Sequence, residues 1–321
     1  MKFGVHTGPQ HIELAELLEL WQELEELGYE WISVWDHLYP TLGDGSIVGP
    51  NHDSIVALTA LALTTKRPQV GCLVWNVTLR HPALLAHAAA SLCQLSGGRL
   101  VIGLGAGWFA KEQTDIGIPF PPPGERVSML EEAVEVVAGL LSEETFAFTG
   151  RHFVIDEARC EPKPVDGRVP IWVGGFRPRV LRVAGTKADG FNIAYVDAAT
   201  WGRAAQVVRQ AASDAGRDPT ALTGSANVGL FVADDMETAR QLCLKAMGPA
   251  VAAMGGHLLG NPDDIARQVE TYRDAGVDLL NVVVRPPFER RWLEVFAREV
   301  IPIFRETTGL QGLESAGNRE E

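Results

Sequence analysis

Cysteines are few in this 321-residue chain, and none of them belongs to a recognisable motif. The four cysteines, Cys72, Cys93, Cys160 and Cys243, include no C-x-x-C pair, and no histidine lies at the spacing of a zinc ligand. This absence argues against a zinc site and a disulfide framework. We expect ordinary buried thiols and no bound metal.

The sequence also lacks a long hydrophobic run and an excess of positive charge. No apolar stretch approaches the roughly 20 residues that cross a bilayer, and Met1 leads straight into a strand-like segment without a signal-peptide pattern. Lysine and arginine together number 28 against 41 acidic residues, which gives a net charge of −13. These features argue against nucleic acid or an anionic membrane as the main partner, and they predict a cytoplasmic protein that binds a small molecule.

The sequence also lacks the glycine pattern of dinucleotide-binding folds. The stretch RLVIGLGAGW (99–108) passes from branched apolar residues to alternating glycines and then to a tryptophan. The dinucleotide fingerprint G-x-G-x-x-G fails here, because its last position is Trp108 and no acidic residue ends a second strand about 20 residues later. Another architecture has to account for Gly103 and Gly105.

Short apolar runs alternate with amphipathic stretches along the chain, a pattern typical of parallel strands covered by helices. The helical stretches carry stop and start signals, such as Gly28 after an apolar stripe and Asn261 before Pro262. We therefore predict an α/β fold, a single (β/α)8 TIM barrel over residues 1–309 with a flexible tail over 310–321. The eight strands are expected near residues 2–7, 31–36, 69–75, 100–105, 170–174, 190–195, 224–232 and 278–284.

Two connections are longer than this repeat requires. Residues 142–169, after strand four, look like a hairpin or an extended excursion, and residues 249–261, after strand seven, look like a Gly-rich apolar loop. Loops longer than about 12 residues are often lids or binding elements. Each insertion is thus either a binding element or a plain surface excursion.

In such a barrel the carboxyl ends of all strands meet at one mouth, where active sites lie. The glycines of strand four would let a flat ring lie against the backbone, and Gly174-Gly175 before a helix would offer amides to a phosphate. Together they suggest a flat, phosphorylated cofactor. For either group of glycines alone, a tight turn is an equally good explanation.

Seven ordered segments resemble the luciferase-like monooxygenase superfamily, especially its branch that uses the deazaflavin coenzyme F420. The likeness is strongest over about residues 2–200 and weaker beyond. The segments are WISVWDHLYP, LRHPALLAHAAASLCQLSGGRLVIGLGAGWFAKE, GIPFPPPGERVSMLEEA, GRHF, EPKP, PIWVGG and ADGFN. The resemblance implies a luciferase-like barrel with a flavin or deazaflavin in its mouth.

Site residues follow from this resemblance position by position. Asp36 and His37 match an Asp-His pair near the redox-active ring, with His37 as the catalytic acid or base. Leu73 and Val74 match a bulge in strand three that often holds a non-proline cis peptide and supports the ring. The cofactor wall corresponds to Gly105, Ala106, Gly107 and Trp108, and the phosphate-binding turn to Gly174 and Gly175, where Arg177 can assist.

The match fails at Ala106, near which the sugar-phosphate dehydrogenases of this superfamily carry a catalytic glutamate. The chain lacks that acid, so glucose-6-phosphate is not expected as its substrate.

The residue types at the mouth indicate how a proton could move there. Histidine accepts or donates a proton near neutral pH, so His37 is the expected acid or base. Asp36, which should point to the opposite face of its strand, either orients the loop or is structural. The substrate pocket is expected to include His6, Trp75 and Arg285.

Three functions remain open at this point. The first is an oxidoreductase that transfers a hydride between coenzyme F420 and an unidentified small organic substrate. The second is an FMN-dependent monooxygenase that uses O2 and a reduced flavin from a separate reductase, and the third is a barrel that binds the cofactor without turnover. Relatives commonly pair through the helices beside strands two and three, so the resemblance also implies a homodimer.

Overall fold

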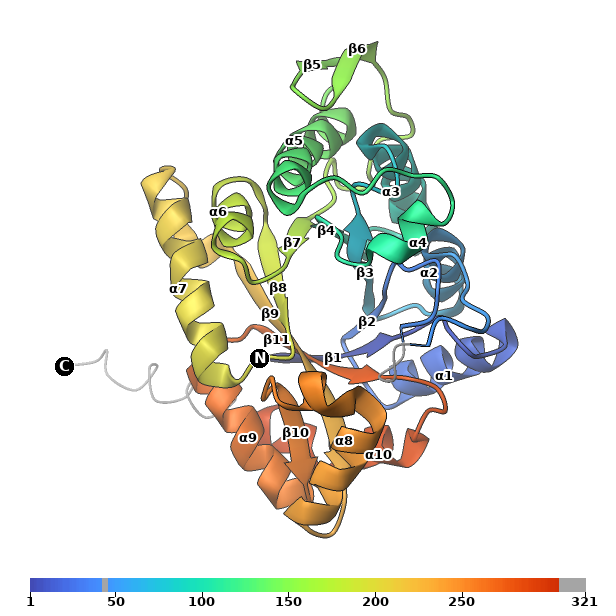
Figure 1. The fold of residues 1–321 in the computed structure, drawn as a ribbon, viewed down its shortest axis with the longest axis vertical. Coiled ribbons are helices and arrows are strands. Elements are labelled where there is room, and N and C mark those ends of the chain that lie inside the picture. Colours follow the sequence, from blue (N-terminus) through green and yellow to red (C-terminus); the bar gives the residue numbers. More distant parts are fainter. Residues whose placement is uncertain (42–45, 306–321) are drawn as a thin grey trace, which may run out of the picture.

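The computed structural model describes residues 1–41 and 46–305, which form a barrel of parallel strands surrounded by helices (Figure 1). The strand order is β10-β9-β11-β1-β2-β3-β4-β7-β8, and a further pairing of β8 with β9 closes the barrel, leaving β10 outside it. The predicted TIM barrel is confirmed. The tail predicted over 310–321 lies outside the described residues.

The barrel strands fall where the apolar runs predicted them. They are β1 (Lys2–Thr7), β2 (Trp31–Val34), β3 (Gln69–Asn76), β4 (Leu100–Gly105), β7 (Ile171–Gly174), β8 (Gly190–Ala194), β9 (Thr223–Val232) and β11 (Leu279–Val284). Neighbouring strands pair in parallel throughout the barrel. Helical crossovers join the pairs that are consecutive along the barrel, and the pairing of β1 with β11 joins its first and last strands.

The helices begin and end at the expected signals. Gly28 takes a φ of 83° just after α1, and Asn261 and Asp264 form a reciprocal capping box at the start of α9. The described α-helices are α1 (Leu14–Glu26), α2 (Ser54–Thr64), α3 (Pro82–Ser96), α4 (Ala110–Thr114), α5 (Pro123–Ser142), α6 (Pro178–Lys187), α7 (Ala198–Asp214), α8 (Met236–Ala252), α9 (Pro262–Asp274) and α10 (Arg290–Val295). None of the helices in the described ranges is both long and apolar enough to cross a membrane.

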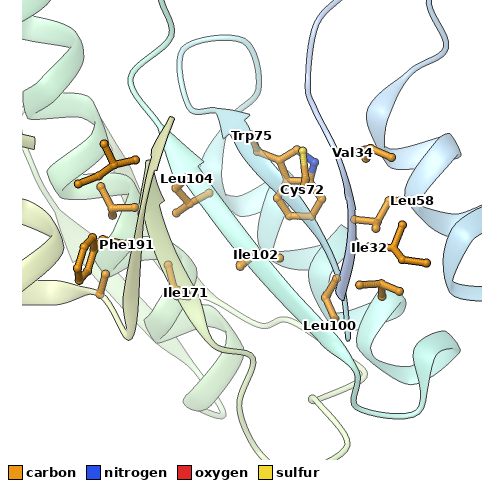
Figure 2. Close-up of a cluster of buried hydrophobic side chains, with 14 of the residues drawn as sticks. Ile32, Val34, Leu58, Cys72, Trp75, Leu100, Ile102, Leu104, Ile171 and Phe191 are labelled. Carbon is orange, nitrogen blue, oxygen red and sulfur yellow. The ribbon is translucent and has the colours of Figure 1, made fainter. Parts of the chain in front are cut away.

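The main hydrophobic core lies between the strands and the surrounding helices. Figure 2 shows part of it, where Ile32 and Cys72 of neighbouring strands lie near Leu58 of α2. A smaller cluster fills the barrel interior, where Trp31 and Trp172 stack with ring centroids 5.0 Å apart. All four cysteines are buried and free, as expected.

The first insertion takes one of the two forms predicted for it, and the second differs from its prediction. The first forms an antiparallel hairpin of β5 (Phe146–Thr149) and β6 (Val154–Ala158), which projects away from the barrel (Figure 1). The second was expected to be a loop, and this is wrong: it contains the end of α8 and the strand β10 (His257–Gly260), which pairs with β9. Main-chain hydrogen bonds to the free edge of β9 order a segment whose glycine-rich composition favours a loop.

Candidate active site

A cavity of about 700 Å³ opens at the carboxyl ends of β2, β3, β4 and β7. Trp35, Asn76 and Glu112 line it in addition to the predicted residues. The sequence-predicted residues on its wall are Asp36, His37, Leu73, Val74, Gly105, Ala106, Gly107, Trp108, Gly174, Gly175 and Arg177. The fold thus brings the whole predicted cofactor set and His37 to one cavity.

A bulge in β3 decides which side chains reach this cavity. The pairing of β3 with β4 shifts between Cys72 and Trp75, and the peptide between Leu73 and Val74 is cis. The shift reverses the in-and-out alternation of the strand, so that Asn76 lines the cavity.

Trp75 was expected in the substrate pocket, and this is wrong. Because the bulge reverses the alternation of β3, Trp75 turns outward and is fully buried in the main core, beside Cys72 in Figure 2.

The glycines around the bulge make room for Val74. A Cβ added at Gly105 would lie 2.3 Å from Val74 Cγ2, and one at Gly174 would lie 2.6 Å from Val74 Cγ1. Gly105 and Gly174 both line the cavity, and contact of the strand-four glycines with a flat ring stays a prediction. Both glycines let the Val74 side chain occupy the barrel mouth, where its methyl groups offer an apolar surface to a planar ligand.

Asn76 provides a polar contact at the same wall. Its Oδ1 accepts hydrogen bonds from the main chain and hydroxyl of Thr78, at 3.0 and 2.8 Å. Its Nδ2 is buried and has no partner among the described residues. An unpartnered buried donor costs free energy unless a ligand or water accepts from it, so Asn76 fits a cofactor ring that carries carbonyl groups.

The turn between β7 and α6, where a phosphate is predicted to bind, lines another part of the cavity. The Gly175 amide donates to the Asn192 carbonyl at 3.0 Å, so this amide is not available to a phosphate, although both glycines of the predicted turn line the cavity. The amides of Phe176 and Arg177 make no hydrogen bond within the described residues, and the exposed Arg177 side chain has no ion-pair partner there. These groups, just before α6, fit a phosphate.

His37 is held by a carboxylate that the sequence reasoning missed. Both carboxylate oxygens of Glu112 lie 3.1 Å from His37 Nδ1, and Oε2 also accepts the Leu38 amide at 2.9 Å. The Glu112 side chain is 1% exposed and that of His37 14%. Glu112 sits in the motif GWFAKE that carries the family resemblance. The signal that could have identified it is an acidic residue shortly after the predicted strand four.

Asp36 borders the cavity, but its carboxylate accepts hydrogen bonds from residues other than His37. Arg80 Nη1 donates to both oxygens at 2.7 Å, the Ser54 hydroxyl donates at 2.7 Å, and the main-chain N–H of Asn76 donates at 3.0 Å. Arg80 also pairs with Asp53 at the start of α2. Asp36 therefore ties the ends of β2 and β3 together, and it does not orient His37.

A third group of side chains lies on the β1 and β11 side of the mouth. His6 Nδ1 and Ser33 Oγ are 2.8 Å apart, and the His6 ring lies 5.4 Å from that of Trp35. Burial, followed by the nearby Arg285 and His37, lowers the pKa of His6 to about 3, so His6 is neutral at pH 7. The Arg285 guanidinium lies 5.3 Å from the Trp35 ring and donates to the Thr41 carbonyl.

Two aromatic side chains stand over His37 at the cavity rim. Trp108 and Phe109 stack at 5.2 Å, and their rings meet His37 edge-on at 5.3 and 6.1 Å. Trp108 is 67% exposed. A planar ligand in the cavity would cover part of this exposed apolar surface.

Comparison with known proteins gives the chain a family. The model of the family described as luciferase-like monooxygenase matches residues 1–257. The F420-dependent glucose-6-phosphate dehydrogenase of Nakamurella multipartita is 27% identical over 96% of this chain and 98% of its own length. A protein of the same name from Kineococcus radiotolerans is 32% identical over 60% of this chain and 56% of its own.

Solved structures share the fold at low sequence identity. An F420-dependent secondary alcohol dehydrogenase, solved with an F420–acetone adduct, has a TM-score of 0.82 at 21% identity, covering 94% of this chain and 98% of that one. The EDTA monooxygenase of Chelativorans sp. has a TM-score of 0.83 at 15% identity, covering 96% and 94%. These similarities establish a common barrel and do not choose between the two chemistries.

Proposed function

The chain belongs to the luciferase-like monooxygenase family, and within it we propose an oxidoreductase that exchanges a hydride between coenzyme F420 and a small organic substrate. The curated relatives that span almost the whole chain are named as F420-dependent dehydrogenases. The observation that carries the proposal is the meeting, in one cavity, of an apolar surface for a ring, an unpartnered side-chain amide donor, a turn whose arginine and amides fit a phosphate, and a histidine.

The residues around the cavity have separable tasks. When bound, the deazaflavin accepts or donates a hydride at carbon 5. Val74 and Asn76 would hold its ring, and Arg177 with the neighbouring amides would hold its phosphate. Trp108 and Phe109 would restrict water at the rim, and His37 would take up or release the proton at the substrate's reacting atom.

We propose that the substrate lies between His37 and the group formed by His6, Trp35 and Arg285. No carboxylate is available at Ala106, and Arg285 is the single arginine in this group. We therefore expect a substrate other than glucose-6-phosphate.

A cofactor titration tests the proposal. The purified protein is titrated with oxidised F420 and, separately, with FMN, and binding is followed by fluorescence. We expect F420 to bind at least about tenfold more tightly, a difference of about 1.4 kcal/mol. Tighter binding of FMN would favour the alternative function, a monooxygenase that receives reduced flavin from a separate reductase.

Replacement of His37 tests the mechanism. We expect His37→Ala to lower turnover by about 10²- to 10⁴-fold, the usual contribution of a general acid or base, with little change in the Kd of F420. Turnover is measured as F420 reduction with any substrate found in a screen of small alcohols and hydroxy acids. An equal loss of turnover and F420 affinity would place His37 in the cofactor scaffold.

We further propose a homodimer that pairs through α2 and α3. Val56 and Leu63 of α2 are 57% and 54% exposed, and Leu84 and Leu95 of α3 are 65% and 49% exposed. This clustering of exposed apolar side chains on adjacent helices is typical of a protein interface. Sedimentation should give a dimer that Leu63→Asp converts to monomer, whereas Leu244→Asp on α8 leaves it intact.

A further inference from the structure

We propose that Glu112 is a positioning residue that fixes the tautomer of His37, so that the imidazole presents an unprotonated Nε2 to the substrate. The proposal rests on the proposed function, because it assigns His37 its proton-accepting atom. It goes beyond that function by naming the residue that makes the acceptor available.

The geometry at Nδ1 requires a donor. Both Glu112 oxygens lie 3.1 Å from this nitrogen, and a carboxylate buried to 1% exposure accepts hydrogen bonds and donates none. In a neutral imidazole the nitrogen that faces a carboxylate therefore carries the proton, and the other nitrogen keeps its lone pair. His37 Nε2 is then free to accept.

No competing carboxylate holds the ring. Among the described residues, Glu112 has the one carboxylate within ion-pair distance of His37. The carboxylate of Asp36, which precedes His37 in the chain, accepts hydrogen bonds from Arg80, Ser54 and the main-chain N–H of Asn76. The other close partners of the ring, Trp108 and Phe109, meet it edge-on and fix no proton.

Glu112 is itself held in place by the short helix α4. The adjacent Gln113 is fully buried and donates to Thr78 Oγ1 at 2.9 Å, and this hydroxyl in turn donates to Asn76 Oδ1 at 2.8 Å. The loops after β2, β3 and β4 are thus joined through side chains. These contacts fix the backbone that carries Glu112, and its carboxylate cannot turn away from His37 without breaking the bond to the Leu38 amide.

The proton balance follows from this arrangement. As the substrate's reacting atom loses its proton, a bond forms from that proton to His37 Nε2, and the ring gains a positive charge. The charge faces the Glu112 carboxylate through Nδ1–H, where a buried ion pair stabilises it. In the reverse direction the same proton returns to the substrate.

Nitrogen NMR of the whole protein tests the tautomer without any substrate. The protein is labelled with ¹⁵N-histidine, and His37→Gln identifies the His37 signals. At about pH 8.5, above the ordinary titration range of imidazole, we expect the wild-type ring to carry its proton on Nδ1, with and without F420. A proton on Nε2 would overturn the proposal.

Glu112→Gln gives a directional test. Because Oε2 accepts the Leu38 amide, the glutamine carbonyl should keep that bond and turn its NH2 group toward His37 Nδ1. The imidazole proton should then move to Nε2, and turnover should fall by about 10- to 100-fold with the Kd of F420 changed less than about twofold. An unchanged tautomer, or a parallel loss of F420 affinity, would contradict a positioning role.

Asp115→Asn is the matched control. Asp115 follows α4 and pairs with Lys111 at 2.8 Å, without contacting His37. This variant should keep the wild-type tautomer and F420 affinity, so a change in His37 that it shares with Glu112→Gln would overturn the proposal. Failure of the wild-type protein to bind F420 would contradict the proposed function instead. The tautomer of His37 can still be measured in the protein without F420.

Discussion

The barrel has a cavity at each end, and the two differ in the polar groups that line them. The mouth cavity measures about 700 Å³ and the base cavity, at the amino ends of the strands, about 570 Å³. At the base, Arg273 pairs with Glu270 and Asp274, and Asp278 accepts the Gly224 amide at 2.8 Å. At the mouth, Asn76 Nδ2 and the Arg177 guanidinium have no such partner within the described residues.

A layer of aromatic and aliphatic side chains separates the two ends. The interior cluster contains the stacked Trp31 and Trp172 together with Leu73, Val101 and Leu279. Trp172 lines the base cavity, whereas Leu73 lines the mouth cavity. The two ends therefore differ less in volume than in the hydrogen-bond donors and cations that lack a protein partner, which the mouth has among the described residues.

The largest expected effect comes from filling the space that Val74 occupies. Gly105→Val should weaken F420 binding by at least about 100-fold, because the new side chain forces Val74 away from its position. A Cβ at Gly105 already lies 2.3 Å from Val74 Cγ2, whereas one at Gly124, also on the mouth wall, meets nothing within 4 Å. Gly124→Val is therefore the control. Normal binding by Gly105→Val, measured by fluorescence titration, would show that the bulge does not support the ring.

The features of this site differ in how well the sequence predicts them. The strand positions and the crowding of His37, Val74 and Gly174 at one mouth followed from apolar periodicity, barrel geometry and the family resemblance. The outward orientation of the Trp75 side chain could not be predicted. An extra residue in β3 reverses the in-and-out alternation of its side chains, and no local sequence pattern indicates this shift. The His37–Glu112 pair joins residues 75 positions apart, so it required three-dimensional coordinates.

Strand β10 shows a similar limit at the level of the fold. Its four residues, His257–Gly260, lie in a glycine-rich stretch without a strand-like apolar alternation. They become a strand because β9 offers an unpaired edge beside them. Pairing with a distant segment outweighed local propensity there, which is common for short strands.

A smaller effect should separate one arginine at the mouth, Arg177, from one at the base, Arg273. Arg177→Gln should weaken F420 binding by about tenfold, because an exposed arginine loses part of its attraction to solvent screening. Arg273→Gln at the base should leave F420 affinity unchanged, since its guanidinium is paired with Glu270 and Asp274. Titration of both variants tests the contrast directly. Equal losses would show that net charge, and not a local contact, holds the cofactor.

Acid sensitivity should also originate partly at the mouth. The pKa of His6 is lowered to about 3 by burial, then by Arg285 and His37, from an ordinary value of 6.5. Between these values the unfolded chain binds a proton that the folded protein does not. Stability therefore falls as the pH falls from about 6.5 toward 3, by about 1 kcal/mol per pH unit from this group.

His6→Gln should flatten that part of the stability profile. Glutamine can still hydrogen-bond to Ser33, which lies 2.8 Å from His6 Nδ1, but it has no proton to gain. Urea unfolding at pH values between about 4 and 7 would measure the slope for both proteins. A variant as acid-sensitive as the wild type would assign the slope to another group that titrates in this range, such as His257, whose pKa burial also lowers from 6.5.

The smallest expected effect belongs to the rim of the mouth. Trp108 is 67% exposed and stacks on Phe109, so it can contact a bound ring only at the edge of the cavity. Trp108→Ala should weaken F420 binding by about threefold, the scale of one exposed aromatic contact, and should remove the part of the tryptophan fluorescence that F420 protects from acrylamide. Lys2→Ala at the base should do neither, because Lys2 lies beyond the Trp31–Trp172 layer. A loss of affinity in Lys2→Ala as large as in Trp108→Ala would mean that the two ends of the barrel are energetically coupled through that layer.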